Sequence, residues 1–230
     1  MSEGHGSTGR GWFITIEGPD GAGKTLVADR LRRALEERGF HVRATREPGG
    51  TRVGERVRRI VLDHEPDDAP LDPRTDALLF TAARAQLVAE VIRPALARGE
   101  LVLDARHADS TLAYQGYGGG LPVATLRELQ AFATGGLSPD LTLLLDVPVE
   151  VGLARKQADE QTRFEAVFDL GFHRRVRDGY LELAREEPGR FVVLDATAAV
   201  DLVVERALAA ILARIGTAAE PAPRSVRVQR

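Results

Sequence analysis

The stretch Gly18 to Thr25, GPDGAGKT, has the spacing G-x-x-x-x-G-K-[S/T] of a phosphate-binding loop. A short run rich in apolar and β-branched residues, 13–16, precedes it, and residues 26–31 begin a pattern with helical spacing. A strand, a glycine-rich loop and a helix in this order are the context in which this motif binds phosphate. The sequence therefore predicts a P-loop that joins the first strand of an α/β domain to its first helix.

Each part of this loop has its own task in nucleotide binding. Glycines let the backbone curl so that its N–H groups point at phosphate oxygens, and the following helix N-terminus adds partial positive charge. Lys24 adds a full charge near the β- and γ-phosphates, and the Thr25 hydroxyl is the expected protein ligand of Mg²⁺. A glycine-rich turn that matches by chance is the alternative, and the flanking pattern argues against it. The residues expected to bind ATP are Gly18, Pro19, Asp20, Gly21, Ala22, Gly23, Lys24 and Thr25.

The composition excludes several classes of protein. The chain has 230 residues, no cysteine and a formal net charge of -3, so we expect no disulfide, no thiolate metal site and no nucleic-acid partner. Since no apolar run reaches the roughly 20 residues that span a bilayer, no membrane partner is expected. Residues 1–11 lack the apolar core of a signal peptide and are expected to form a disordered leader. These features favour a cytoplasmic protein.

Apolar runs and helical patterns alternate along the chain. We expect strands at 12–17, 41–45, 101–104, 141–147 and 191–195, and helices at 24–38, 52–63, 75–97 with a bend near Pro94, 109–117, 122–134, 149–160, 164–186 and 199–214. Five strands separated by helices predict one α/β domain, 12–215, with a parallel sheet covered by helices on both faces. Residues 216–230 are expected to form a loose tail. Ligands of such folds bind at the carboxyl ends of the strands.

Several motifs follow the expected strands in series. They are REPGGT at 46–51, LLFTAARAQ at 78–86, RHADSTLAYQG at 106–116, DVPVEVGLAR at 146–155, RFE at 163–165 and FHRRVRDGY at 172–180. Together with the P-loop they resemble the thymidylate kinase (dTMP kinase) family, from about Phe13 to Ile215. The resemblance implies a P-loop NTPase fold with a small mobile lid at about 155–165. It also implies phosphoryl transfer from ATP to dTMP with Mg²⁺, in dTTP synthesis, and a homodimer with the 75–97 helix as a plausible interface.

The resemblance assigns the pyrimidine side of the site. Phe80 and Arg84 are four residues apart and share a helix face; in the family the ring stacks on the base and the guanidinium binds it. Pro48 would form a wall of the base pocket. The alternatives are an ordinary core position for Phe80 and a simple turn proline at 48.

On the sugar side the resemblance implies contacts from the P-loop and from the segment after the third strand. Asp20 would bind the 3′-hydroxyl, and its alternative is a solvated loop position. Tyr114 and Thr111 would line the sugar and leave little room for a 2′-hydroxyl, with Gln115 beside them. Glu165 would either hold the metal through water or contact the sugar.

Arginines are expected at the phosphates. Arg106 should clamp the phosphates between which the γ-group moves, by charge-assisted hydrogen bonds; a surface arginine is the alternative. The P-loop contains no arginine. In the family branch with that property the lid supplies the transition-state arginine, so Arg155 and Arg163 are the candidates. Solvated helix charges are the alternative for both.

Three positions depart from the family pattern. Ala105 stands where the family has an aspartate before the arginine, Gly119 where it has an arginine, and Thr162 where it has an aspartate. Asp104 lies one place earlier, and strand alternation predicts that it faces the opposite side of the sheet. Three hypotheses stay open: an active dTMP kinase, a kinase for another deoxypyrimidine monophosphate, and a silent nucleotide-binding paralogue.

Overall fold

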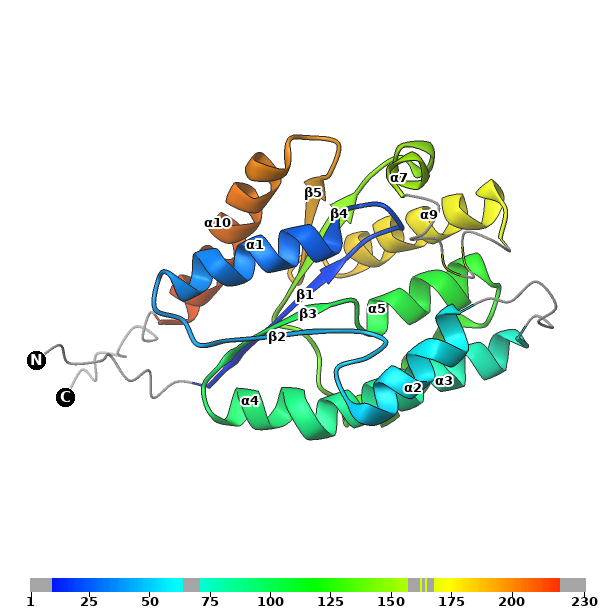
Figure 1. The fold of residues 1–230 in the computed structure, drawn as a ribbon, viewed down its shortest axis with the longest axis horizontal. Coiled ribbons are helices and arrows are strands. Elements are labelled where there is room, and N and C mark those ends of the chain that lie inside the picture. The colour runs from blue at the N-terminus through cyan, green and yellow to red at the C-terminus, as the bar shows by residue number, and fades with distance from the viewer. Residues whose placement is uncertain (1–9, 64–70, 157–161, 163, 165–167, 220–230) are drawn as a thin grey trace, which may run out of the picture.

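One parallel sheet lies between two layers of helices in the computed structural model, which describes residues 10–63, 71–156, 162, 164 and 168–219 (Figure 1). Its strands are paired in the order β2-β3-β1-β4-β5, and every pairing is parallel. The predicted five-stranded parallel sheet is therefore confirmed. The strands are β1 (Trp12–Glu17), β2 (Val42–Arg46), β3 (Leu101–Ala105), β4 (Leu141–Asp146) and β5 (Phe191–Asp195).

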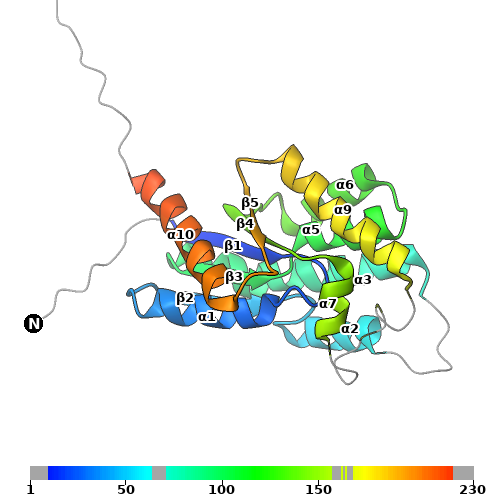
Figure 2. The ribbon, with the colours of Figure 1, turned by 90° about the horizontal axis from the view of Figure 1, so that it is seen from above.

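Strand alternation distributes apolar side chains to both faces of the sheet. Ile14 and Ile16 pack in the core that contains α1 (Lys24–Glu36) and α10 (Val200–Ala219), whereas Phe13 packs on the opposite side. That second face is covered by α3 (Pro73–Leu87), α5 (Ala108–Thr111) and α9 (Leu170–Glu186), which Figure 2 labels, and by α4 (Arg93–Ala97). The helices α2 (Arg52–Leu62), α6 (Val123–Thr134) and α7 (Val149–Arg155) complete the fold.

The expected long helix at 75–97 is a continuous helical stretch that widens in its middle. Residues Val88–Ile92 form a π-helical turn, in which the Arg93 N–H donates to the Val88 carbonyl. Pro94 has no N–H to donate, and a proline ring clashes with the carbonyl group four residues earlier in a helix. This is the physical reason for the irregular turn beside it. A second π-helical segment, Leu112–Gly118, follows α5.

The structure corrects three expected boundaries. The helix expected at 164–186 begins only at Leu170, because the Asp169 side chain accepts from the Phe172 N–H at 2.8 Å and caps α9 there. The helix α10 continues to Ala219, so the expectation of a loose tail is wrong for 216–219. Gly11 donates its N–H to the Leu96 carbonyl, and Arg10 pairs with Asp140, so these two belong to the fold and not to a leader. The rest of the expected leader and tail, and residues 157–160 of the helix expected at 149–160, lie outside the described residues.

Within the described part of the chain, every helix is too short or too polar to span a membrane.

Candidate active site

A cavity of about 790 Å³ opens at the carboxyl ends of the strands. Its middle is formed by the segment after β1, which is the predicted P-loop, and by Arg106 after β3. One end is apolar and lies beyond β5, with Ala196, Ala198 and Val203 in its wall. The other end lies beyond β2 and against α3, where Pro48 and Phe80 line it. The cavity is large enough for nucleotide-sized ligands and lies where α/β sheets bind them.

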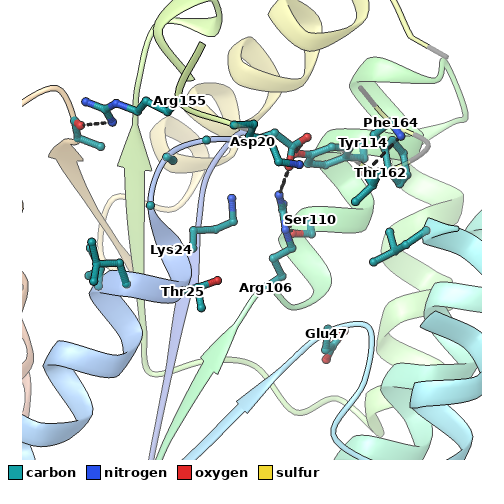
Figure 3. A pocket seen from close by; sticks show the side chains of 18 of the residues that line it. Asp20, Lys24, Thr25, Glu47, Arg106, Ser110, Tyr114, Arg155, Thr162 and Phe164 are labelled. Carbon is teal, nitrogen blue, oxygen red and sulfur yellow. Dashed lines mark hydrogen bonds and ion pairs between the residues drawn. The ribbon is translucent and has the colours of Figure 1, made fainter. Parts of the chain in front are cut away.

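The P-loop has the tight backbone that its glycines predict. Gly21 has φ +71°, and a Cβ there would lie 1.8 Å from the carbonyl oxygen of Gly152 in α7. Only glycine fits this approach, which brings the loop against α7. Lys24 and Thr25 form the first turn of α1 and line the cavity (Figure 3).

Lys24 is held by the loop itself. Its Nζ donates to the carbonyl oxygens of Gly18 at 2.9 Å and Pro19 at 2.7 Å. Burial, together with the nearby charge of Arg106, lowers the pKa of Lys24 to about 7. Phosphate groups beside this ammonium would favour its charged form. The P-loop is thus ready to receive an anion.

Arg106 has a backbone conformation that a side chain rarely adopts. Its φ is +72°, the only positive value for a non-glycine residue in the described chain. Its N–H donates to the Ile16 carbonyl at 2.9 Å, which ties the end of β3 to β1. Strain of this kind persists where the surrounding structure fixes it, and it is often found at functional sites.

This conformation directs the Arg106 guanidinium across the P-loop (Figure 3). It forms an ion pair with Asp20 at 2.6 Å and donates to the Tyr114 hydroxyl at 3.0 Å. The Tyr114 hydroxyl in turn donates to Asp20 at 2.7 Å. Burial alone would raise the pKa of Asp20, but the charges of Arg106 and Lys24 lower it. The three side chains form one cluster at the boundary between the two ends of the cavity.

The end of the cavity beyond β2 contains most of the residues expected to bind the base and the sugar, but Arg84 lies behind the wall. Pro48, Phe80, Thr111 and Gln115 line the cavity. Arg84 is 1% exposed and is absent from the lining. Its guanidinium donates to Thr111 Oγ1 at 2.9 Å and to the His107 carbonyl at 2.8 Å, and it also bonds Gln130.

The lid residues are only partly described. Arg155 donates to the Ala196 carbonyl at 2.8 Å, at the apolar end of the cavity and away from Arg106 (Figure 3). This position does not place Arg155 at the phosphates, where it was expected. Arg163 and Glu165 lie outside the described residues, whereas Lys156, Thr162 and Phe164 line the cavity.

Comparison with known proteins decides between the families that use a P-loop. The family model described as thymidylate kinase matches residues 16–207. The thymidylate kinase of Deinococcus radiodurans is 54% identical over 188 residues, which cover 82% of this chain and 90% of that protein. The thymidylate kinase of Thermomicrobium roseum is 52% identical over 202 residues, covering 87% of this chain and 94% of that protein.

The chain belongs to the thymidylate kinase family. The crystal structure of thymidylate kinase from Ehrlichia chaffeensis has the same fold, with a TM-score of 0.71 and 30% identity. That alignment covers 88% of this chain and 99% of that one. The predicted family and the P-loop NTPase fold class are both confirmed.

The departures from the thymidylate kinase pattern have distinct places in the structure. Asp104 is fully buried and shares its side of β3 with Val102, which packs against α3 and α4. Ala105 is on the other side, with Leu103, which packs in the core formed by α1. The predicted opposite orientation of Asp104 is confirmed, so its carboxylate does not replace the missing one beside the P-loop.

The other two departures, Gly119 and Thr162, likewise lack the charged side chain that the family has at these positions. Gly119 is exposed at the end of the π-helical segment, and its N–H donates to the Tyr114 carbonyl at 2.8 Å. Thr162 lines the cavity. The family's arginine and carboxylate charges are therefore missing at these points.

Several residues of the cavity wall were not among the predicted site residues, Arg58, Glu47 and Phe164 among them. Arg58 extends from α2 and donates to the Pro48 carbonyl at 3.0 Å; burial and the nearby Arg46 lower its pKa. Its spacing of four from the buried Gly54 would have placed it on the inner face of α2. Glu47 and Phe164 belong to motifs that were noted, but single side chains of a motif do not reveal which of them reach a cavity.

Proposed function

We propose that this chain transfers the γ-phosphoryl group of ATP to dTMP, which yields dTDP and ADP for dTTP synthesis. A phosphate oxygen of dTMP attacks the γ-phosphorus, and the bond from that phosphorus to the bridging β-oxygen breaks. The bond electrons leave on the β-phosphate of ADP, so the site needs positive charge more than a proton acceptor. The relatives at about half identity, all thymidylate kinases, support the substrate pair.

ATP would lie along the P-loop, with its adenine at the apolar end of the cavity. Ala196, Ala198 and Val203 offer apolar contact there, and Arg155 lies beside them. Backbone N–H groups of the loop would bind the β- and γ-phosphates, and Lys24 would neutralise part of their charge. Arg155 is consequently assigned to the adenine end, and Arg163 remains the candidate for the lid arginine at the phosphates.

The dTMP would occupy the opposite end. Phe80 would stack on the pyrimidine and Pro48 would form the adjacent wall, since both line the cavity. Thr111 and Gln115 would contribute polar contacts, and Arg84 would support Thr111 from behind. Arg58 lines the same end and would add positive charge for the 5′-phosphate.

Arg106 lies where the two phosphate chains would meet. Its guanidinium contacts both Asp20 in the P-loop and Tyr114 on the dTMP side. It would stabilise the charge that spreads over the transferred group, an interaction typically worth about 10² to 10³ in rate. Asp20 and Tyr114 would hold it in place and contact the sugar.

Mg²⁺ fits the residues that are present. The Thr25 hydroxyl is exposed in the cavity beside Lys24, and Mg²⁺ keeps several water and phosphate ligands of its own. Thr25 would thus be its protein ligand, and Glu165 would either hold the metal through water or contact the sugar. The bound ion would neutralise part of the charge of the phosphates.

The observation that carries the proposal is the Asp20–Arg106–Tyr114 cluster, which joins the P-loop to a pocket with the family's pyrimidine-binding residues. The test is an ADP-release assay with a panel of nucleoside monophosphates. We expect the highest kcat/KM for dTMP. ADP release that does not depend on dTMP would refute the proposal, and a stronger preference for another monophosphate would replace the substrate.

We also infer a homodimer and a cytoplasmic location. Exposed apolar side chains on α2 and α3, Ile60 and Leu78 among them, support an interface on this side of the fold. ATP and nucleoside monophosphates are cytoplasmic metabolites, which supports the location. Light scattering of the purified protein tests the dimer: a monomer at micromolar concentration, or an unchanged dimer after Leu78→Glu, contradicts this interface.

A further inference from the structure

Four charged side chains lie together behind the pyrimidine end of the cavity. They are Glu47 after β2, Arg84 on α3, Asp104 on β3 and His107 after β3, and none is more than 4% exposed. None of them has a direct part in the proposed phosphoryl transfer. Charges buried this deeply are costly unless they are paired, so their arrangement calls for an explanation.

The Glu47 carboxylate is held from two directions. Its Oε2 lies 2.7 Å from Nε of Arg84, and its Oε1 lies 2.8 Å from Nδ1 of His107. The same Nδ1 is 3.3 Å from Oδ2 of Asp104. Asp104 makes no hydrogen bond with the described residues, so this imidazole is its nearest counter-charge. His107 thus lies between two carboxylates and connects Asp104 to the Glu47–Arg84 pair.

Glu47, Asp104 and His107 also have the spacing of metal ligands, with donor atoms within 4.8 Å of one another. Charge balance argues for a proton instead. Two carboxylates are neutralised by Arg84 and an imidazolium, whereas a divalent cation with a neutral imidazole would leave one buried excess positive charge. Burial raises the pKa of Asp104 to about 7, so above that pH its carboxylate is ionised and balances the imidazolium. Burial alone would lower the pKa of His107, but Glu47 and Asp104 raise it to about 9.

The cluster is connected to the cavity wall on two sides. Glu47 itself lines the cavity and directly precedes Pro48 in the expected base pocket. The backbone carbonyl of His107 accepts from Arg84 at 2.8 Å, and Arg84 donates to Thr111, which also lines the cavity. A change in the His107 position would therefore move contacts on both sides of the pyrimidine.

We propose that Asp104 and the His107 imidazolium are positioning residues, which together fix Glu47 and Arg84 and so shape the pocket that recognises the pyrimidine. The carboxylate that this chain lacks beside the P-loop is present one residue earlier, on the opposite face of the sheet, in this different role. The inference rests on the proposed function for the identity of the base. It assigns to Asp104 and His107 an effect on dTMP affinity and none on the chemical step.

A double variant separates positioning from simple stabilisation. Asp104→Leu or His107→Phe alone leaves a buried charge without its partner, which is expected to destabilise the fold strongly. The combined variant Asp104→Leu/His107→Phe removes both and leaves the Glu47–Arg84 pair balanced, so it should fold. We expect its Kd and KM for dTMP to rise about tenfold, the change expected for loss of one charged hydrogen bond, with kcat and KM for ATP unchanged.

Ile211→Ala is the matched control, because Ile211 is also fully buried but packs in the core on the opposite face of the sheet. It should lower the melting temperature and leave the Kd for dTMP unchanged. A folded double variant with the wild-type Kd for dTMP would overturn the proposal. Calorimetry gives this Kd without turnover, so absence of kinase activity would count against the proposed function only.

Nitrogen NMR of the histidine-labelled wild-type protein gives a second readout. We expect both nitrogens of the His107 ring to carry a proton at pH 7.5, and one of these protons to be lost only near pH 9. In the Asp104→Asn variant this proton should be lost at lower pH. A neutral His107 ring at pH 7.5, or an equimolar bound metal in elemental analysis of the wild-type protein, would refute the proposal.

Discussion

The backbone of Arg106 allows its role in stability to be separated from its role in catalysis. We compare Arg106→Ala with Arg106→Gly, which remove the same side-chain contacts to Asp20 and Tyr114. Because φ is +72°, alanine suffers about 1–2 kcal/mol of left-handed strain, whereas glycine suffers none but loses about 0.5–1 kcal/mol more chain entropy on folding. The glycine variant should therefore be more stable by roughly 0.5–1 kcal/mol.

Activity should not follow this order. Both variants lack the guanidinium at the phosphates, so we expect both to lose about 10² to 10³ in kcat. Melting temperatures from calorimetry should differ by about 1–4 °C in favour of glycine, at 2–4 °C per kcal/mol for a chain of this size. Rates come from the ADP-release assay at saturating ATP and dTMP.

Arg206 provides the matched control, since it is an exposed position inside α10. There the order should reverse, with Arg206→Ala more stable than Arg206→Gly by about 1 kcal/mol and both fully active. Lower stability of Arg106→Gly than of Arg106→Ala, or a rate within tenfold of the wild type in either variant, would contradict these roles of Arg106.

Three further changes test separate parts of the site. Phe80→Ala should raise KM for dTMP about 10- to 100-fold through lost stacking, with KM for ATP unchanged; equal effects on both substrates would contradict its place at the base. Tyr114→Phe removes the hydroxyl between Asp20 and Arg106 and should lower kcat/KM for dTMP about tenfold; an unchanged value would refute this contact. In the free protein the pKa of Lys24 is lowered to about 7. Above that pH the folded state binds fewer protons than the unfolded state, so the contribution of Lys24 to the free energy of unfolding rises with pH from 7 to 10. ATP should restore the charge, so binding at pH 8 should take up a proton, as measured by calorimetry in two buffers, and Lys24→Met should abolish this uptake.

The sequence was most informative where a local rule determines the structure. The P-loop, the strand alternation that turns Asp104 away from Ala105, and the irregular turn beside Pro94 each follow from neighbouring residues. The packing of distant segments was not predictable in this way. Residue spacing correctly placed Arg84 on the face of α3 that carries Phe80, yet packing against Thr111 and Gln130 buries its guanidinium behind the wall.

Two other features depend on contacts between distant segments. The contact of Arg155 with the Ala196 carbonyl joins positions from α7 and the end of β5, so no local pattern could show it. The pairing of His107 with Glu47 similarly joins the ends of β3 and β2, which lie side by side only in the folded sheet. The family resemblance supplied the expected roles, and the fold decided which side chains can reach them.

The central claim is that this chain is an active dTMP kinase although Ala105 replaces the family's aspartate. Single-turnover formation of dTDP from dTMP, ATP and Mg²⁺ by the wild-type protein and by Ala105→Asp tests it directly. We predict that the wild-type protein forms dTDP at a rate within tenfold of the variant, because Lys24 and Arg106 remain in place. Formation of dTDP by the Ala105→Asp variant alone would contradict the account and identify the natural chain as a silent nucleotide-binding protein.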